Sequence, residues 1–211
     1  LPKAATSGSG GDHLRSRGGT VFDGVNWPAT ATVGLTVLGL FVAYANNLRL
    51  EKRKAEMKFL SDQLQYLYGP LFALTQAADE AWNSFMSKCR PGEKYFFGGK
   101  HPLMPEDFKL WRLWMAEVFM PINLKMEEAV VQNTHLIEGG VFPDSFRDLI
   151  AHVEGYKVIM KKWSTDDFSD QESDHVSSLN YPDGFNEDIK TTFDTIKVRH
   201  ARILGRQFHD E

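Results

Sequence analysis

The sequence contains a single cysteine, Cys89, among its 211 residues. One thiol excludes an internal disulfide framework and any zinc site built from several cysteines. The net charge is only −4, so the chain lacks the broad basic surface that sequence-independent nucleic-acid binding requires. Period-two alternation of apolar and polar residues, the mark of half-buried β-strands, is also missing.

Catalytic and cofactor-binding motifs are missing as well. The sequence has no His-Glu-x-x-His, P-loop or dinucleotide-binding pattern, and no Glu-x-x-His pair of the kind that di-iron bundles use. His135 and Glu138 are three residues apart, and Asp148 and His152 four apart, as many surface pairs on helices are. We therefore predict no enzyme, no metal and no cofactor. An enzyme that uses His135, Glu138 or His152 is a third alternative.

Residues 1–23 form a polar N-terminal arm that is rich in glycine and serine. The arm contains no apolar core of a signal peptide. Its first residue is Leu1, not methionine, and we expect that residues before it have been removed. Such a segment is a flexible coil by itself, so the arm is either a tether laid over a partner or a disordered tail.

What the sequence does contain is a long stretch without charge, residues 24–48. At 1.5 Å per residue, a helix of this length crosses the hydrocarbon core of a bilayer. Trp27 and Tyr44 lie near its ends, where interfacial aromatic side chains are found. The alternative, a buried core helix, is normally shorter and amphipathic. We predict a single transmembrane helix.

Basic residues follow the apolar stretch directly, in residues 49–58. Before it, the nearest basic residues are Arg15 and Arg17. The positive-inside rule then places the C-terminal part of the chain on the cytoplasmic, stromal or matrix side. The predicted membrane-interface anchors are Trp27, Tyr44, Arg49, Lys52, Arg53 and Lys54.

Small residues recur at helical spacing within the apolar stretch, at Thr32, Thr36, Gly39 and Ala43. Transmembrane helices associate through close packing of small side chains, because lipid offers little hydrophobic driving force between helices. These four residues are therefore the predicted contact with a partner helix, although small residues are also common in spans that have no partner.

Residues 49–211 show apolar residues at helical spacing, which predicts a soluble helical domain. We expect a break or kink at Gly69-Pro70, a bend at Pro121, and helix ends near Ile137 and at Gly205. Residues 90–104 and 164–183 are the long loops. The predicted fold is all-α, with one transmembrane helix followed by an antiparallel bundle of about four helices, some of them kinked.

Two loop segments have unusual composition. Residues 95–97, Tyr-Phe-Phe, are predicted to fold onto the core or to contact a partner or the membrane surface. The loop 164–183 contains many acidic residues and no Lys or Arg. It is either a solvated connection or a site where a basic partner docks through electrostatic attraction.

Several short motifs resemble uncharacterised membrane-anchored helical proteins of bacteria and algae, over about residues 45–205. The resemblance implies a fold arrangement and no activity, and the Gly/Ser arm lies outside it. The segments that carry it are 66–71 (YLYGPL), 111–115 (WRLWM), 118–123 (VFMPIN), 135–139 (HLIEG), 151–153 (AHV), Trp163, 167–169 (DFS) and 178–182 (SLNYP).

The leading hypothesis for function is a non-catalytic, single-pass accessory subunit of a large organellar membrane complex. The resemblance to algal proteins favours a photosynthetic complex, a photosystem supercomplex of the thylakoid, over a respiratory or ATP synthase complex of the mitochondrial inner membrane. Its partners would be the lipid bilayer and integral membrane subunits. The alternative from another class is a membrane-tethered sensor or ligand-binding bundle, with a pocket near Trp111, Trp114 and Met115.

Overall fold

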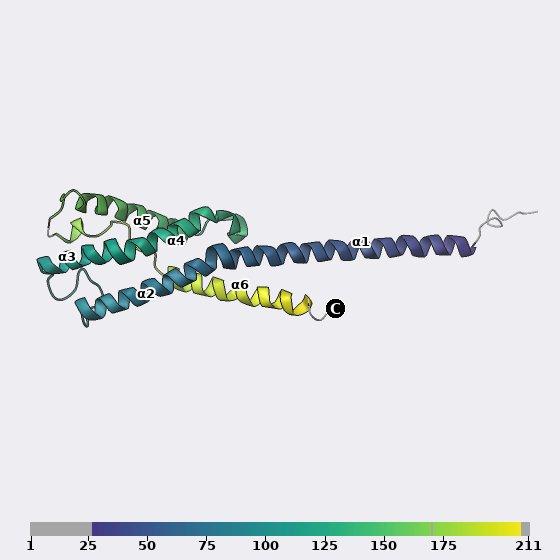
Figure 1. The fold of residues 1–211 in the computed structure, drawn as a ribbon, viewed down its shortest axis with the longest axis horizontal. Coiled ribbons are helices and arrows are strands. Elements are labelled where there is room, and N and C mark those ends of the chain that lie inside the picture. Colours follow the sequence, from purple (N-terminus) through teal and green to yellow (C-terminus); the bar gives the residue numbers. More distant parts are fainter. Residues whose placement is uncertain (1–26, 170, 208–211) are drawn as a thin grey trace, which may run out of the picture. The chain divides into compact units, whose positions relative to one another are not determined.

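The computed structural model describes residues 27–169 and 171–207, and the predicted arm, residues 1–23, lies outside them (Figure 1). Every regular element within these ranges is helical and none is a strand, which confirms the all-α prediction. The α-helices are α1 (Trp27–Asp62), α2 (Gly69–Cys89), α3 (Pro105–Trp114), α4 (Met120–Gln132), α5 (Asp144–Trp163) and α6 (Phe185–Gln207).

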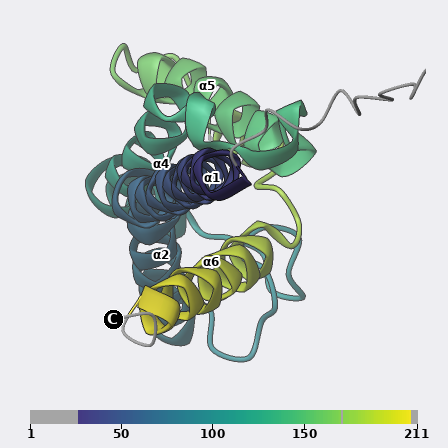
Figure 2. The same cartoon turned by 90° about the vertical axis from the view of Figure 1, so that its right-hand side faces the viewer.

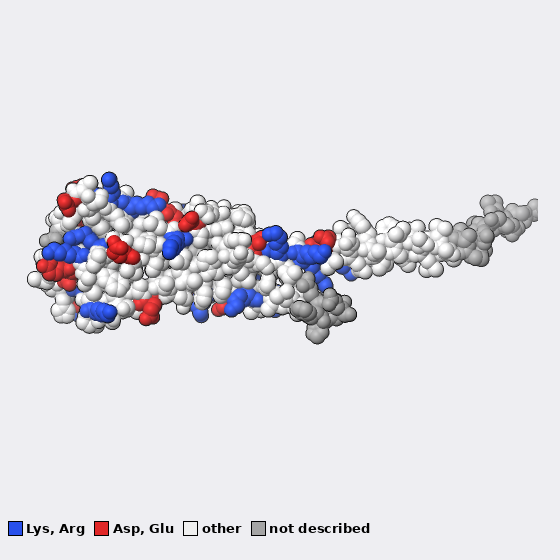
Figure 3. Space-filling view, viewed as in Figure 1, with Lys and Arg blue, Asp and Glu red and all other residues white. Residues whose placement is uncertain are grey.

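The chain divides into two compact units, Leu1–Leu50 and Glu51–Glu211. In the first unit, every described side chain of α1 is exposed, including Leu35 at 70% and Phe41 at 68%. Figure 3 shows α1 without charge until the basic residues that follow Leu48. Within the described residues there is one helix long and apolar enough to cross a membrane, as judged by length and composition.

In the second unit, two π-helices interrupt the predicted helices: η1 (Gln63–Tyr68) and η2 (Met115–Phe119). Each precedes a proline by two residues, Pro70 and Pro121. A proline has no N–H to donate to the carbonyl four residues earlier. Just before each proline, a backbone N–H instead bonds five residues back, from Gly69 to Leu64 and from Met120 to Met115. At both places the chain stays helical, so the break expected at Gly69-Pro70 is a change of helix type.

Two helix ends differ from the prediction. Helix α4 ends at Gln132, where Asn133 leaves the helical region with φ −121°, and the chain continues in the short 3₁₀ helices η3 (Thr134–Leu136) and η4 (Glu138–Gly140). Helix α6 continues past Gly205 to Gln207. A single glycine inside a helix costs only about 1 kcal/mol relative to alanine, so it does not by itself end α6.

The core of the second unit lies among α2, α4, α5 and α6. Helix α2 packs against α4 and α6, and α4 packs against α5 (Figures 1 and 2). An aromatic cluster surrounds the fully buried Phe85. The rings that contact Phe85 are those of Trp82, Phe96, Trp111, Trp114 and Phe119.

Candidate functional site

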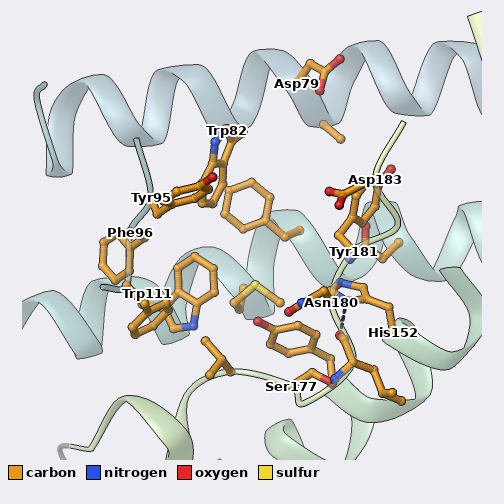
Figure 4. Close-up of a pocket in the computed structure, with 18 of the residues that line it drawn as sticks. Asp79, Trp82, Tyr95, Phe96, Trp111, His152, Ser177, Asn180, Tyr181 and Asp183 are labelled. Atoms are coloured by element: carbon orange, nitrogen blue, oxygen red, sulfur yellow. Dashed lines mark hydrogen bonds between the residues drawn. The ribbon is translucent and has the colours of Figure 1, made fainter. Parts of the chain in front are cut away.

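A cavity of about 680 Å³ opens beside the aromatic cluster, entirely within the second unit (Figure 4). Its walls come from α2, α3, η2, α4, α5 and α6 and from the loops 90–104 and 164–184. Ligand pockets in proteins usually have volumes of about 300–1,000 Å³ and combine apolar walls with a few converging polar groups. The cavity has the size and the composition of such a pocket.

The loop 90–104 supplies part of the aromatic wall. Phe96 is 1% exposed and stacks on Trp111, with 5.0 Å between ring centroids, whereas Tyr95 is 58% exposed. Arg90 donates a hydrogen bond to the carbonyl of His101 (2.7 Å), which joins the two ends of the loop. The loop therefore folds its central phenylalanine into the core and leaves the neighbouring tyrosine at the opening.

The π-helix η2 contributes Met115 and Phe119 to the cavity wall, and Asn123 follows one turn later. Asn123 is only 7% exposed, and its side chain makes no hydrogen bond to any described residue. The side chain lies on the wall of the cavity, where a ligand can reach it. The Asn123 amide is therefore a recognition group available inside the cavity.

The acidic loop forms the opposite wall, held by hydrogen bonds from core side chains to its backbone. Trp111 donates to the carbonyl of His175 (2.8 Å) and Trp163 to that of Asp174 (2.9 Å). Gly155 in α5 lets this wall approach closely, because a Cβ atom there would collide with the Ser177 hydroxyl. The loop predicted as a solvated connection or a docking site thus builds the cavity.

Two polar side chains from α5 face the cavity in their neutral forms. Burial lowers the pKa of His152, and hydrogen bonding to the Leu179 carbonyl (2.8 Å) and to the backbone of Asn180 only partly offsets this effect. Because that carbonyl is an acceptor, Nδ1 carries the proton and Nε2 of the neutral ring is an acceptor. Burial raises the pKa of Tyr156 to about 12.

A chain of hydrogen bonds links three segments at the polar side of the cavity. The Tyr181 hydroxyl donates to Oδ1 of Asn186 (2.7 Å), and Nδ2 of Asn186 donates to Oδ1 of Asp79 (2.7 Å). Burial raises the pKa of Tyr181, so its hydroxyl stays protonated as a donor. The chain fixes the orientation of the Asp79 carboxylate, and Oδ2 of Asp79 has no hydrogen-bond partner among the described residues.

The structure brings together only some of the residues that were predicted to line a pocket or to act in catalysis. Trp111 and Met115 line the cavity, whereas Trp114 packs against Phe85 and does not. Of the three candidate catalytic residues, His152 lines the cavity, His135 is exposed elsewhere, and Glu138 accepts a hydrogen bond from Arg199 (2.7 Å). Among the described residues, no three or more His, Cys, Asp or Glu side chains are grouped so as to hold a metal.

The predicted membrane-contact residues lie on α1. Thr32, Thr36, Gly39 and Ala43 are exposed, and a Cβ atom on Gly39 would have no atom within 4 Å. Tyr44 and the four basic anchors, Arg49, Lys52, Arg53 and Lys54, are exposed too, and Trp27 is the first residue of α1. Their roles as contacts and anchors stay predictions.

Family models, curated proteins and solved structures give no match to this chain. The resemblance to membrane-anchored proteins of bacteria and algae therefore stays a prediction. The chemistry of the cavity and the surface of α1 are what bear on function. Sequence reasoning missed Asp79 as a cavity residue, although it lies three residues before Trp82 on α2 and so near the same face.

Proposed function

We propose that the chain is a membrane-tethered helical domain that binds a small, partly apolar molecule in its cavity. The observation that carries this proposal is an aromatic cavity of about 680 Å³ lined by Asn123, whose amide makes no hydrogen bond to any described residue. The position of η2 in the cavity wall supports the proposal, since π-helical turns within longer helices are often found at functional sites.

The proposed tether is α1, crossing a bilayer as a single span, with the basic residues 49–58 on the cytoplasmic, stromal or matrix side. The helices that follow are proposed to form one bundle around the cavity. After membranes from expressing cells are washed with alkaline carbonate, the protein is expected in the pellet. Recovery in the supernatant would contradict the tether. The orientation is tested with protease added to sealed vesicles. We expect the arm to be protected and residues 51–211 to be cleaved.

Filling the cavity tests the ligand-binding function. Ala78 lines the cavity, whereas its neighbour Ala77 is exposed and does not. The variant Ala78→Phe places a ring in the cavity, and Ala77→Phe adds the same ring to the surface. The probe is 4-phenylbutan-1-ol, titrated by calorimetry into the full chain in phosphatidylcholine nanodiscs, with empty nanodiscs as reference. In a second titration, an extract of native membranes competes with the probe for binding.

The expected result is saturable binding that Ala78→Phe weakens at least about tenfold and that Ala77→Phe leaves unchanged, because only the first ring occupies the space that the ligand needs. Circular dichroism and thermal unfolding check that both variants are folded. If a folded Ala78→Phe variant binds the probe as the unmodified chain does, the cavity is not the binding site.

A second candidate function is the accessory subunit of a membrane complex, photosynthetic or respiratory. The exposed stripe Thr32, Thr36, Gly39 and Ala43 favours it, since small residues let two transmembrane helices approach closely. Gly39→Leu is expected to abolish co-purification of integral membrane subunits. Gly34→Leu is the matched control, because Gly34 lies on the opposite face of α1. Purification of the protein as a monomer without other subunits would contradict this function.

A further inference from the structure

The cavity has two chemically different ends (Figure 4). Trp82, Tyr95, Phe96 and Trp111 gather at one end, which we call the aromatic end. At the other, the polar end, lie Asp79, His152, Asn180, Tyr181 and Asp183. A molecule that fills the cavity therefore meets aromatic rings with one part and polar groups with the other.

The charge at the polar end has one sign. Asp79 and Asp183 are acidic, and no Lys or Arg is found among the described residues that line the cavity. His152 stays neutral because burial lowers its pKa. Two basic groups lie over rings of the aromatic end, Lys94 over Tyr95 at 4.9 Å and Arg90 over Phe96 at 6.0 Å. The polar end is thus negative and carries no compensating cation of its own.

The N-terminus of α6 also lies near this end, and a helix N-terminus by itself attracts anions. Here that preference is already met by the chain, because Glu187 and Asp188 occupy the first turn of α6. Neither of these two acids lines the cavity, and the acidic residue of this segment that does is Asp183, four and five residues before them. An anionic ligand group would meet acidic side chains at this end, and a cationic group would be attracted.

The polar end is also prepared to accept hydrogen bonds. Asn186 orients the Asp79 carboxylate through Oδ1, which leaves Oδ2 as an acceptor. Nε2 of neutral His152 is a second acceptor. An ammonium group has three N–H donors and no acceptor, so it matches these groups in charge and in hydrogen bonding. The Asn123 amide, which makes no hydrogen bond to the described residues, lines the same cavity as a further polar group.

We propose that the ligand is an amphiphilic amine, with an apolar or aromatic body at the aromatic end and its ammonium group between Asp79 and Asp183. This inference rests on the proposed ligand-binding function and specifies the chemical class of the ligand. Primary amines of this kind are cationic at neutral pH, as the lysine side chain is.

Three probes with the same body test the inference: 4-phenylbutylamine, 4-phenylbutan-1-ol and 4-phenylbutanoate. Each is titrated by calorimetry into the full chain in phosphatidylcholine nanodiscs, with empty nanodiscs as reference. We expect the amine to bind about three- to tenfold more tightly than the alcohol, since partly exposed ion pairs contribute about 0.2–1 kcal/mol each. The carboxylate is expected to bind most weakly.

Removal of the two charges provides the decisive variant. The double variant Asp79→Asn/Asp183→Asn keeps the side-chain shape and is expected to bring the amine to the affinity of the alcohol. The matched control Glu80→Gln/Glu187→Gln removes two charges from neighbouring exposed residues that do not line the cavity, and is expected to retain most of the preference. Alcohol affinity in both variants reports whether the cavity is intact.

The outcomes separate the two proposals. If the alcohol or the carboxylate binds as tightly as the amine, and Ala78→Phe blocks that binding, the cavity binds ligands but the amine inference is wrong. An amine preference that both double variants lose equally would also overturn it, because the effect would then come from net charge. If none of the three probes binds saturably, the proposed function itself fails.

Discussion

The two π-helices begin from the same local chemistry and end in different surroundings. Both η1 and η2 come two residues before a proline, and in both a backbone N–H reaches back five residues. The residues of η1 pack against α2 and α6 and border a space of only about 140 Å³. Those of η2 border the cavity of about 680 Å³.

The two π-helices differ in what surrounds the residues before each proline. Pro70 cannot donate to the Tyr66 carbonyl, and the side chain of Asn133 donates to that carbonyl instead (3.0 Å). This hydrogen bond connects η1 to the residue that follows α4. In η2, Met115 and Phe119 border a space that no side chain of the described residues fills. The two π-helices therefore differ in whether the surrounding elements leave room for a ligand.

The largest expected effect distinguishes the packed π-helix from the open one. Leu67 in η1 is 0% exposed and has neighbours on all sides, so Leu67→Ala is expected to destabilise the fold by about 2–5 kcal/mol. Met115→Ala in η2 is expected to cost less, because part of that side chain borders the cavity and has fewer atoms in contact. Urea unfolding of the full chain in nanodiscs measures both. Equal losses would contradict the comparison.

The next effect concerns Gly69, which ends η1. A Cβ atom at this position would collide with the backbone carbonyl of Leu64. Gly69→Ala is therefore expected to destabilise the second unit by about 1–3 kcal/mol through a forced backbone shift. Gly205→Ala is the control, because Gly205 has open space around it and alanine is the better helix former. A stable Gly69→Ala variant would show that η1 readjusts easily.

A smaller effect is expected from the side chain that satisfies the Tyr66 carbonyl. Asn133→Ala removes its hydrogen bonds to the carbonyls of Tyr66 and Ala129, and we expect a loss of about 0.5–1.5 kcal/mol. Gln132→Ala removes only an exposed contact with Glu128, and we expect less than about 0.5 kcal/mol. The same unfolding measurement applies. If both variants lose equally little, water replaces Asn133 at this carbonyl.

The smallest expected effect is a dependence of stability on pH that comes from His152, which lines the cavity. Burial lowers the pKa of His152 below 6.5, so below pH 6.5 the unfolded chain binds a proton that the folded chain does not. Its contribution is complete above pH 6.5 and is lost as the pH falls below that value. His152→Gln is expected to reduce the decline in unfolding free energy between pH 7.5 and 5, and His135→Gln, at an exposed position, to leave it unchanged. These pH values bracket the ordinary histidine pKa of about 6.5.

Much of the fold could be predicted from the sequence, because helical periodicity is a local signal. Residues at the spacing of Phe146, Leu149 and Val153 face the core as expected. An irregularity near Gly69-Pro70 and near Pro121 was predictable from proline chemistry, but its form as a π-helix was not. That form depends on where the freed carbonyls find partners, and Asn133 is 67 residues from Tyr66.

The candidate site was predictable only in part. A pocket was predicted near Trp111, Trp114 and Met115, and the first and last of these line the cavity. The acidic loop gave no local sign that it forms a wall, since its position depends on hydrogen bonds from Trp111 and Trp163, which lie in other elements. Asp79 and Asn186 become one polar group only after α2 and α6 pack together.

Gln63 shows how one polar residue can determine the alignment of a helix. It lies in a buried row otherwise made of Leu60, Leu67 and Leu71, and its Nε2 donates to the Leu136 carbonyl (2.7 Å). Leucines tolerate small rotations and shifts of a helix with little change in energy, whereas a directional bond is satisfied in one arrangement. A leucine at position 63 would bury more apolar surface and select less strongly among alternative packings. The amide thus contributes uniqueness of the fold more than its stability.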